Sequence, residues 1–298
     1  MTEMLDDLFD LGDDDITTVN RRQTVKAPFG WVGGKSESLK HMLPIFGRLL
    51  KDKWVDVFGG SGIVSWNMPN VRLMVYNDAY SGVYDFYRCL QDERLCDRLI
   101  YYIGQLMPPH SREQWYAARD EWCTDKDVVV RAAKWFYMIK GSVISKGKCY
   151  GRSTNSKAQI SIPNALADFS IIHEKLHSFQ LENLDFRTCL KDYDSRNALI
   201  YCDPPYIHTD TGIYDVKFSM SDYKDLLRLI GQCSGTVCLS GYPNELADNQ
   251  SYWTSRETWD VSIRAEAHAY SEQNNKADKR DVQTVGVARE VLWIKESK

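Results

Sequence analysis

The tetrapeptide Asp203-Pro204-Pro205-Tyr206 combines groups that could bind and orient a polar ligand. It directly follows the apolar run 198–202, ALIYC, which predicts a short buried strand. Because proline has no N–H and a fixed φ, two consecutive prolines cannot continue a central strand, so the strand must end at Asp203. The turn then presents one carboxylate, backbone carbonyls that no neighbouring strand can use, and one aromatic face. Ligands of open α/β sheets bind at this end of the strands, which makes the tetrapeptide a candidate site.

A second candidate site follows the apolar segment 54–58, WVDVF, which is succeeded by the glycine turn 59–62 and the segment IVSW. Strand, glycine turn and helix form the first unit of a nucleotide-binding sheet, although Ser65 occupies the third glycine position of the usual pattern. The next predicted strand, 73–76, ends before Asp78. A carboxylate at that place can accept hydrogen bonds from both hydroxyls of a ribose. Asp78 could equally cap the following helix, and both roles could hold together.

The elements that would position these residues alternate between strands and helices, as in an α/β protein. A helix beginning near Ser36 would bury Leu39, Met42, Leu43 and Phe46. Helices are predicted over 83–103, 111–123, 127–139 and 165–178, and further strands over 236–240, 259–263 and 290–294.

A basic loop follows the third of these helices. Between residues 140 and 157 the chain has glycines and no acidic residue, and its basic residues are Lys140, Lys146, Lys148, Arg152 and Lys157. Such a loop suits contacts with backbone phosphates of a nucleic acid. A merely solvated loop is the alternative.

The overall composition is that of a globular protein, with 43% hydrophobic and 26% charged residues among 298. No run approaches the roughly 18 apolar residues of a membrane span, and the N-terminal segment does not resemble a signal peptide. The eight cysteines form no C-x-x-C pair, so the sequence predicts neither a zinc site nor a disulfide framework. We therefore expect a cytoplasmic protein without a metal.

The charge is unevenly distributed. Residues 1–20 hold seven acidic residues and no Lys or Arg, whereas the remaining chain has 37 basic and 34 acidic residues. Residues 1–26 predict a disordered acidic extension. Alternatively, they form a short amphipathic helix that docks on a partner or on the protein's own basic groove. The mildly basic body is compatible with a nucleic-acid partner.

Four stretches together resemble the Dam-like N6-adenine DNA methyltransferases, which carry D-P-P-Y motifs. They are PFGWVGGK at 28–35, VDVFGGSG at 55–62, VYND at 75–78, and LDF with YCDPPY at 184–186 and 201–206. The later segment AREVLWI, 288–294, is similar to phage-type members of that family. The loop after the helix 127–139 departs from the one that reads GATC in enterobacterial-type members, so no target sequence is implied.

The resemblance implies a role for each matching residue. Asp203 and the carbonyl of Pro204 would orient the adenine amine, with Pro205 completing the turn and Tyr206 stacking on a flipped-out base. Asp78 would bind the ribose of S-adenosylmethionine, Asp185 its adenine amine, and Lys35 its carboxylate. The remaining cofactor-binding residues would be Trp31, Asp56, Phe58, Gly60, Ser61, Gly62 and Phe186. The basic residues of the loop 140–157 would contact double-stranded DNA.

The implied fold is α/β, a Rossmann-like S-adenosylmethionine-dependent methyltransferase fold with an inserted, mainly helical target-recognition domain. Residues 27–84 and 181–298 would form the catalytic domain and 85–180 the insertion. The implied activity is methylation of adenine N6 in DNA, by a phage or restriction-modification type of enzyme inside a bacterial or phage-infected cell. Methylation of cytosine N4, methylation of adenine in RNA, and a catalytically silent DNA-binding module remain alternatives.

Overall fold

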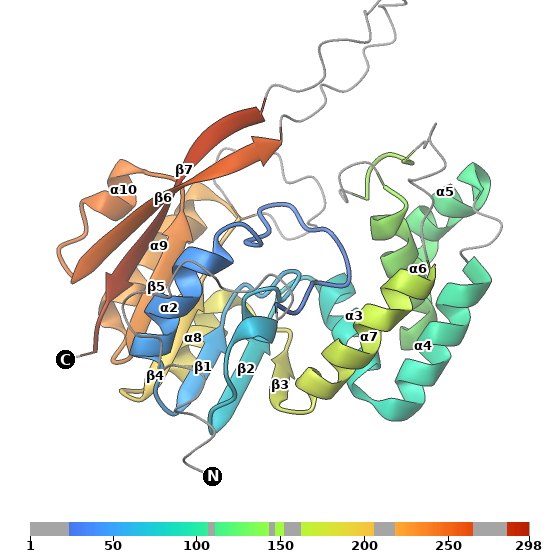
Figure 1. Cartoon of the computed structure of the whole chain (residues 1–298), viewed down its shortest axis with the longest axis horizontal. Coiled ribbons are helices and arrows are strands. Elements are labelled where there is room, and N and C mark those ends of the chain that lie inside the picture. The colour runs from blue at the N-terminus through green and yellow to red at the C-terminus, as the bar shows by residue number, and fades with distance from the viewer. Residues whose placement is uncertain are drawn as a thin grey trace, which may run out of the picture.

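The protein is built around one central sheet of seven strands (Figure 1). The computed structural model describes residues 24–106, 111–142, 147–151, 162–205, 218–264 and 285–297. The strand order is β3-β2-β1-β4-β5-β7-β6. The strands are β1 (Lys53–Asp56), β2 (Leu73–Asn77), β3 (Phe179–Glu182), β4 (Ala198–Cys202), β5 (Thr236–Gly241), β6 (Ser255–Arg264) and β7 (Val285–Lys295).

The first five strands in this order pair in parallel, and β7 pairs antiparallel with both β5 and β6. β1 lies between β2 and β4, so the order of the strands reverses there. In open α/β sheets such a reversal opens a crevice outside the carboxyl ends of the strands. The predicted α/β, Rossmann-like fold class is confirmed, and both candidate sites lie at this edge.

Helices cover both faces of the sheet, as Figure 1 shows. On one face α2 (Leu39–Leu49) packs through Leu39, Met42 and Phe46 in the same apolar cluster as Trp54 and Tyr201. On the other face α8 (Phe186–Tyr193), α9 (Met220–Gln232) and the short α10 (Glu245–Asp248) bury their apolar residues against the opposite sides of β1, β4 and β5. The near-continuous apolar strands are explained by this double coverage.

Between β2 and β3 the described residues form five α-helices, which pack together beside the sheet (Figure 1). They are α3 (Ser81–Gln91), α4 (Glu93–Leu106), α5 (Arg112–Glu121), α6 (Val128–Lys140) and α7 (Ile162–Leu176). The single helix predicted over 83–103 is wrong in one respect, because the chain breaks at Asp92. There the Asp92 side chain accepts a hydrogen bond from the Leu95 N–H (3.0 Å) and begins a new helix.

The segment after the glycine turn also differs from the prediction. Only one turn of 3-10 helix forms, at Ser65–Asn67, where the pattern predicts a helix. Pro69 follows closely, and the residue before a proline avoids helical geometry. Met68 accordingly has extended backbone angles (φ −79°, ψ 145°), which end the helical turn.

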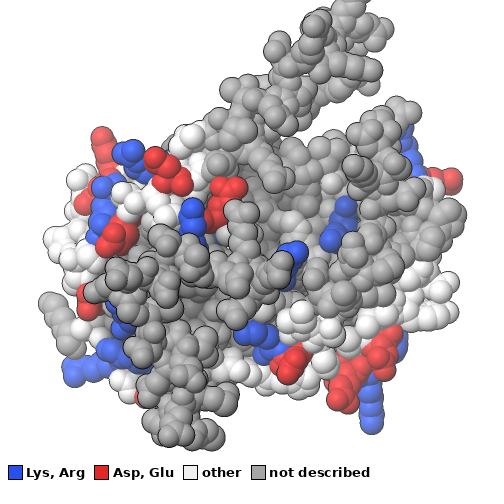
Figure 2. All heavy atoms as spheres, in the orientation of Figure 1, with Lys and Arg blue, Asp and Glu red and all other residues white. Residues whose placement is uncertain are grey.

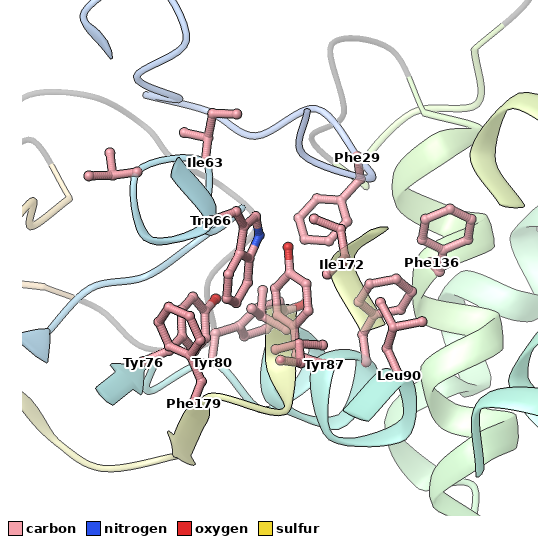
Figure 3. Close-up of a cluster of buried hydrophobic side chains, with 14 of the residues drawn as sticks. Phe29, Ile63, Trp66, Tyr76, Tyr80, Tyr87, Leu90, Phe136, Ile172 and Phe179 are labelled. Atoms are coloured by element: carbon pink, nitrogen blue, oxygen red, sulfur yellow. The ribbon is translucent and has the colours of Figure 1, made fainter. Parts of the chain in front are cut away.

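An aromatic cluster joins the sheet to the five helices (Figure 3). The rings of Trp66 and Tyr76 stack at 5.2 Å, and Tyr87 packs edge-on against both. Phe29, from the segment before α2, meets the ring of Trp135 edge-on at 5.0 Å. These contacts place the segment that carries Trp31 and Lys35 next to the glycine turn.

The proposed domain boundaries at residues 84 and 180 stay a prediction. Residues 1–23 of the acidic segment lie outside the described residues, and so do Lys146, Arg152, Lys157 and Tyr206. Among the described helices none is long and apolar enough to cross a membrane.

Candidate active site

The glycine turn after β1 forms one wall of the candidate site. Gly60 and Gly62 have positive φ angles of 52° and 68°, which favour glycine. A Cβ on Gly60 would lie 2.6 Å from the indole nitrogen of Trp31, and one on Gly62 would lie 2.1 Å from the ring of Trp66. Side chains at either position would therefore displace the aromatic residues around the turn.

Asp78 is fixed to this turn by backbone groups. Its carboxylate accepts hydrogen bonds from the N–H of Gly60 (2.7 Å) and the N–H of Tyr80 (2.8 Å). Burial raises the pKa of Asp78 to about 6, while these two amides lower it. The residue that caps α3 is Tyr80, so Asp78 is not the helix cap that the sequence also allowed.

Asp56 lies at the end of β1, deeper in the same site. Its Oδ2 accepts a hydrogen bond from the hydroxyl of Ser65 (2.6 Å). Oδ1 is buried and receives no hydrogen bond from the described residues. The pKa of Asp56 is raised to about 7, chiefly by burial and in addition by the charges of Asp203 and Asp78, while the Ser65 hydroxyl and the Phe58 amide lower it. A buried acceptor without a donor is costly, and a cationic or N–H donor ligand would satisfy it.

Asp203 lies at the end of β4, where its carboxylate is held by two side chains. The ammonium of Lys35 is 2.7 Å from Oδ2, and the hydroxyl of Ser240 donates to Oδ1 (2.8 Å). Tyr201 shares a 3.0 Å hydrogen bond with the same Ser240 hydroxyl. Lys35 also donates to the carbonyl of Gly33 (2.8 Å) and lies 3.4 Å from Oε1 of Glu290.

Ser240 and Glu290 were not among the predicted site residues. Ser240 is the last residue but one of the apolar strand β5, which lies beside β4 only in the folded sheet. Glu290 directly precedes the apolar run 291–294, VLWI, and it is buried on β7. An acid within an apolar strand is the signal that could have identified it.

A further wall of the site is aromatic. Phe58, Phe186 and Phe218 approach one another with ring centroids 5.7 to 5.8 Å apart. The side chain of Asn77 joins the segments that carry these rings, because it donates to the carbonyl of Val57 (2.8 Å) and accepts from the Leu184 N–H (2.8 Å).

Asp185 is placed at the outer end of this wall. It caps α8 by accepting the N–H of Arg187 (2.9 Å), and its side chain remains 52% exposed. The guanidinium of Arg187 lies 4.3 Å above the Phe186 ring and pairs with Asp222 (2.6 Å) and Asp225 (2.7 Å) of α9. Asp185 is thus exposed to solvent, unlike Asp56 and Asp78.

Trp31 lies beside the glycine turn, and Ser61 is buried within it. The ring of Trp31 contacts those of Tyr80 and Trp135, with centroids 6.3 and 6.2 Å away. The structure therefore brings together Trp31, Lys35, Asp56, Gly60, Ser61, Gly62, Asp78 and Asp203 around the ends of β1, β2 and β4.

The predicted DNA-binding residues that are described lie in the helical part. Lys140 ends α6 and lies over the Phe136 ring, whereas Lys148 is exposed and its backbone carbonyl accepts from Arg119 (3.3 Å). On the face shown in Figure 2, the described Lys and Arg side chains are spread over the surface rather than gathered in one patch. Among the described residues no group of His, Cys, Asp and Glu could hold a metal ion.

The sequence model of the D12 class N6 adenine-specific DNA methyltransferases matches residues 31–245, which include the glycine turn, Asp78 and Asp203. This chain belongs to the D12 class family. Its members are methyltransferases, so a methyl donor is implied. The family match confirms the resemblance inferred from the four motifs.

This chain is also similar to the modification methylase StsI of Streptococcus sanguinis, with 22% identity over 213 residues. The alignment covers 68% of this chain and 32% of StsI. The chain thus spans about a third of the length of that relative.

Proposed function

We propose that this protein transfers a methyl group from S-adenosylmethionine to N6 of adenine in DNA. The observation that carries this proposal is the position of Asp203 next to the turn that holds Asp78. The two carboxylates end strands on either side of β1, and both charges act on Asp56 between them. One crevice can therefore accept a methyl donor on one side and an amine on the other.

The residues present suit the cofactor. Asp56, Asp78, Asp203 and Glu290 place four carboxyl groups in or next to the site, and Lys35 is the cation that the structure pairs with two of them. When bound, S-adenosylmethionine supplies an electrophilic methyl group on a sulfonium cation, and it also carries an ammonium group. Both positive charges complement this acidic crevice, and the ammonium is a suitable donor for Oδ1 of Asp56.

The geometry of the site supports further contacts with the cofactor. Each carboxylate oxygen of Asp78 can accept a second hydrogen bond beside its backbone amide, which suits the ribose hydroxyls. The aromatic wall of Phe58 and Phe186 would cover the adenine ring, with Asp185 at its exposed amine. Lys35 and Trp31 would lie at the methionine end.

Asp203 would hold the second substrate. The exocyclic amine of adenine is a poor nucleophile because its lone pair is delocalised into the ring. Two acceptors, the Asp203 carboxylate and the Pro204 carbonyl, would bind its two hydrogens and favour a tetrahedral nitrogen. Transfer would form a nitrogen–carbon bond as the carbon–sulfur bond breaks, and the methylated amine would then lose one proton to solvent.

The adenine must leave the duplex to reach Asp203, and we propose that Tyr206 stacks on it there. Residues 85–180 would recognise the target. In that segment Lys140, Lys146, Lys148, Arg152 and Lys157 would contact the backbone of double-stranded DNA.

The proposal is tested by incubating the protein with methyl-labelled S-adenosylmethionine and unmethylated bacterial DNA, followed by digestion to nucleosides. We expect the label in N6-methyladenine, and the Asp203→Ala variant provides the control. Label found only in cytosine, or only in a parallel RNA sample, would contradict the proposal. Binding of DNA without any transfer would identify a silent module instead.

A further inference from the structure

Glu290 is a charged residue at a buried position, where a charge destabilises the folded protein unless it is paired. It lies in the middle of β7, between the exposed Arg289 and the buried Val291, and its own side chain is 5% exposed. A buried carboxylate destabilises a fold unless it is well paired, and replacing such a pair with apolar residues is often neutral or stabilising. The 3.4 Å separation from Lys35 is longer than a close ion pair. Glu290 is nevertheless near enough to share the Lys35 ammonium with Asp203.

β6, which pairs with β7, contacts the chain segment that follows Lys35. Trp259 of β6 is directly opposite Glu290 in the antiparallel register, so the two side chains project from the same face. The indole N–H of Trp259 donates to the hydroxyl of Ser38 (3.0 Å), and its ring stacks on His41 (5.3 Å, 17°). The β6–β7 ribbon thus contacts the start of α2 through Trp259 and the end of the Lys35 side chain through Glu290.

Lys35 is placed between two carboxylates at unequal distances, 2.7 Å from Asp203 and 3.4 Å from Glu290. In this arrangement both oxygens of Asp203 are already bound, one by Lys35 and one by Ser240. Methyl transfer moves positive charge from sulfur to the amine nitrogen that Asp203 must hold. An ammonium in contact with the same carboxylate would oppose that charge.

We propose that Glu290 is a positioning residue that takes over the Lys35 ammonium when Asp203 accepts the adenine amine. This inference rests on the proposed function, since it assigns the exchange to the same site. The long, flexible lysine side chain can move between the two carboxylates without moving the backbone that Trp259 holds. Glu290 would keep Lys35 charged and close while freeing Oδ2 of Asp203 for the substrate.

The Glu290→Gln variant tests the exchange, because glutamine has nearly the same shape but no charge. We expect single-turnover methyl transfer to DNA to slow about tenfold, while the Kd for S-adenosylmethionine changes less than about threefold. Glu257→Gln, at an exposed position of β6, is the matched control, and we expect it to behave as the wild type.

The Lys35→Met background separates this role from a merely structural one. If Glu290 acts through Lys35, adding Glu290→Gln to Lys35→Met should change the rate less than about twofold. Equal slowing in both backgrounds would overturn the inference, and so would a wild-type rate for Glu290→Gln.

If Glu290→Gln does not fold, Glu290→Asp carries the same test. Its carboxylate is retained but set back from Lys35, so the rate should fall about threefold in the native background and stay unchanged with Lys35→Met. A wild-type protein that transfers no methyl group to adenine would refute the proposed function itself. Transfer by the wild type together with an unaffected Glu290 variant would refute only this inference.

Discussion

Asp78 directly follows β2 and Asp203 directly follows β4, the two strands on either side of β1. Different kinds of group hold the two carboxylates. Asp78 accepts two backbone amides from the turns next to β1 and β2, and burial raises its pKa to about 6. Asp203 is held by the hydroxyl of Ser240 and by the ammonium of Lys35, which comes from a separate loop. Backbone partners keep their places during a reaction, whereas side chains can exchange. The difference is consistent with the proposed roles, in which Asp78 stays bound to one ligand and Asp203 changes its partner.

The strongest test of this comparison is Asp203→Ala. Removing the acceptor for the amine should slow methyl transfer by about 10³-fold or more, since preorganised electrostatic groups contribute on this scale. The Kd for S-adenosylmethionine, measured by calorimetry, should stay within about threefold of the wild type. Asp260→Ala, at an exposed position on β6, is the control. Near-normal turnover of Asp203→Ala would remove the distinction between the two carboxylates.

Asp78→Asn should show the opposite pattern. The variant loses the charge that the amides of Gly60 and Tyr80 support, and we expect binding of S-adenosylmethionine to weaken about 30-fold, as for loss of a charged hydrogen bond. At saturating cofactor the turnover number should fall less than about fivefold. A variant that binds normally but turns over slowly would show that Asp78 acts in the reaction.

Ser240→Ala should have a smaller effect on the reacting side. The variant removes the hydroxyl that donates to Oδ1 of Asp203. Of the two side chains that hold this carboxylate, Lys35 then remains, so the carboxylate is less well oriented. We expect turnover to fall about tenfold with an unchanged KM for the cofactor. The exposed Ser251→Ala variant should leave both constants unchanged, and a selective rise in the KM of Ser240→Ala would contradict the assignment.

The smallest expected effect concerns pH and the buried Asp56. Its folded-state pKa, about 7, lies above the ordinary value of about 3.8, so its contribution to stability is fully present below pH 4 and is lost as the pH rises through 7. Asp56→Asn cannot ionise. Between pH 5 and pH 8 we expect the melting temperature of this variant to gain roughly 2–4 °C relative to the ligand-free wild type. A constant difference across that range would contradict the raised pKa, because it would show that folded Asp56 is already ionised at pH 5.

Much of this site follows from local sequence patterns. Apolar runs predict β1, β2, β4 and β5, and the predicted ends of these strands lie within two residues of the observed ones. The carboxyl ends of parallel strands share one edge, so Asp56, Asp78 and Asp203 could be expected to lie close together. Local chemistry also explains the errors, because Pro69 shortens a predicted helix and Asp92 divides another.

The partners of Asp203 could not be predicted in this way. Ser240 becomes a neighbour only because β5 lies beside β4, and Glu290 only because β7 lies between β5 and β6. No local pattern of the sequence specifies which strands become neighbours in the sheet. The same holds for Lys35, whose motif implies a cofactor contact but gives no indication of its ion pair with Asp203.

The place of β7 in the sheet has a consequence for the order in which the protein matures. β7 follows both of its neighbours in the sequence, so during synthesis β5 and β6 leave the ribosome before the strand that joins them. Until β7 inserts, the edge of β5 is unpaired and open to wrong association. Trp259 and Glu290 also cannot yet meet across the ribbon to hold the Lys35 segment. Newly made chains should therefore acquire cofactor binding at the glycine turn earlier than a properly held Lys35, and catalytic competence should come last.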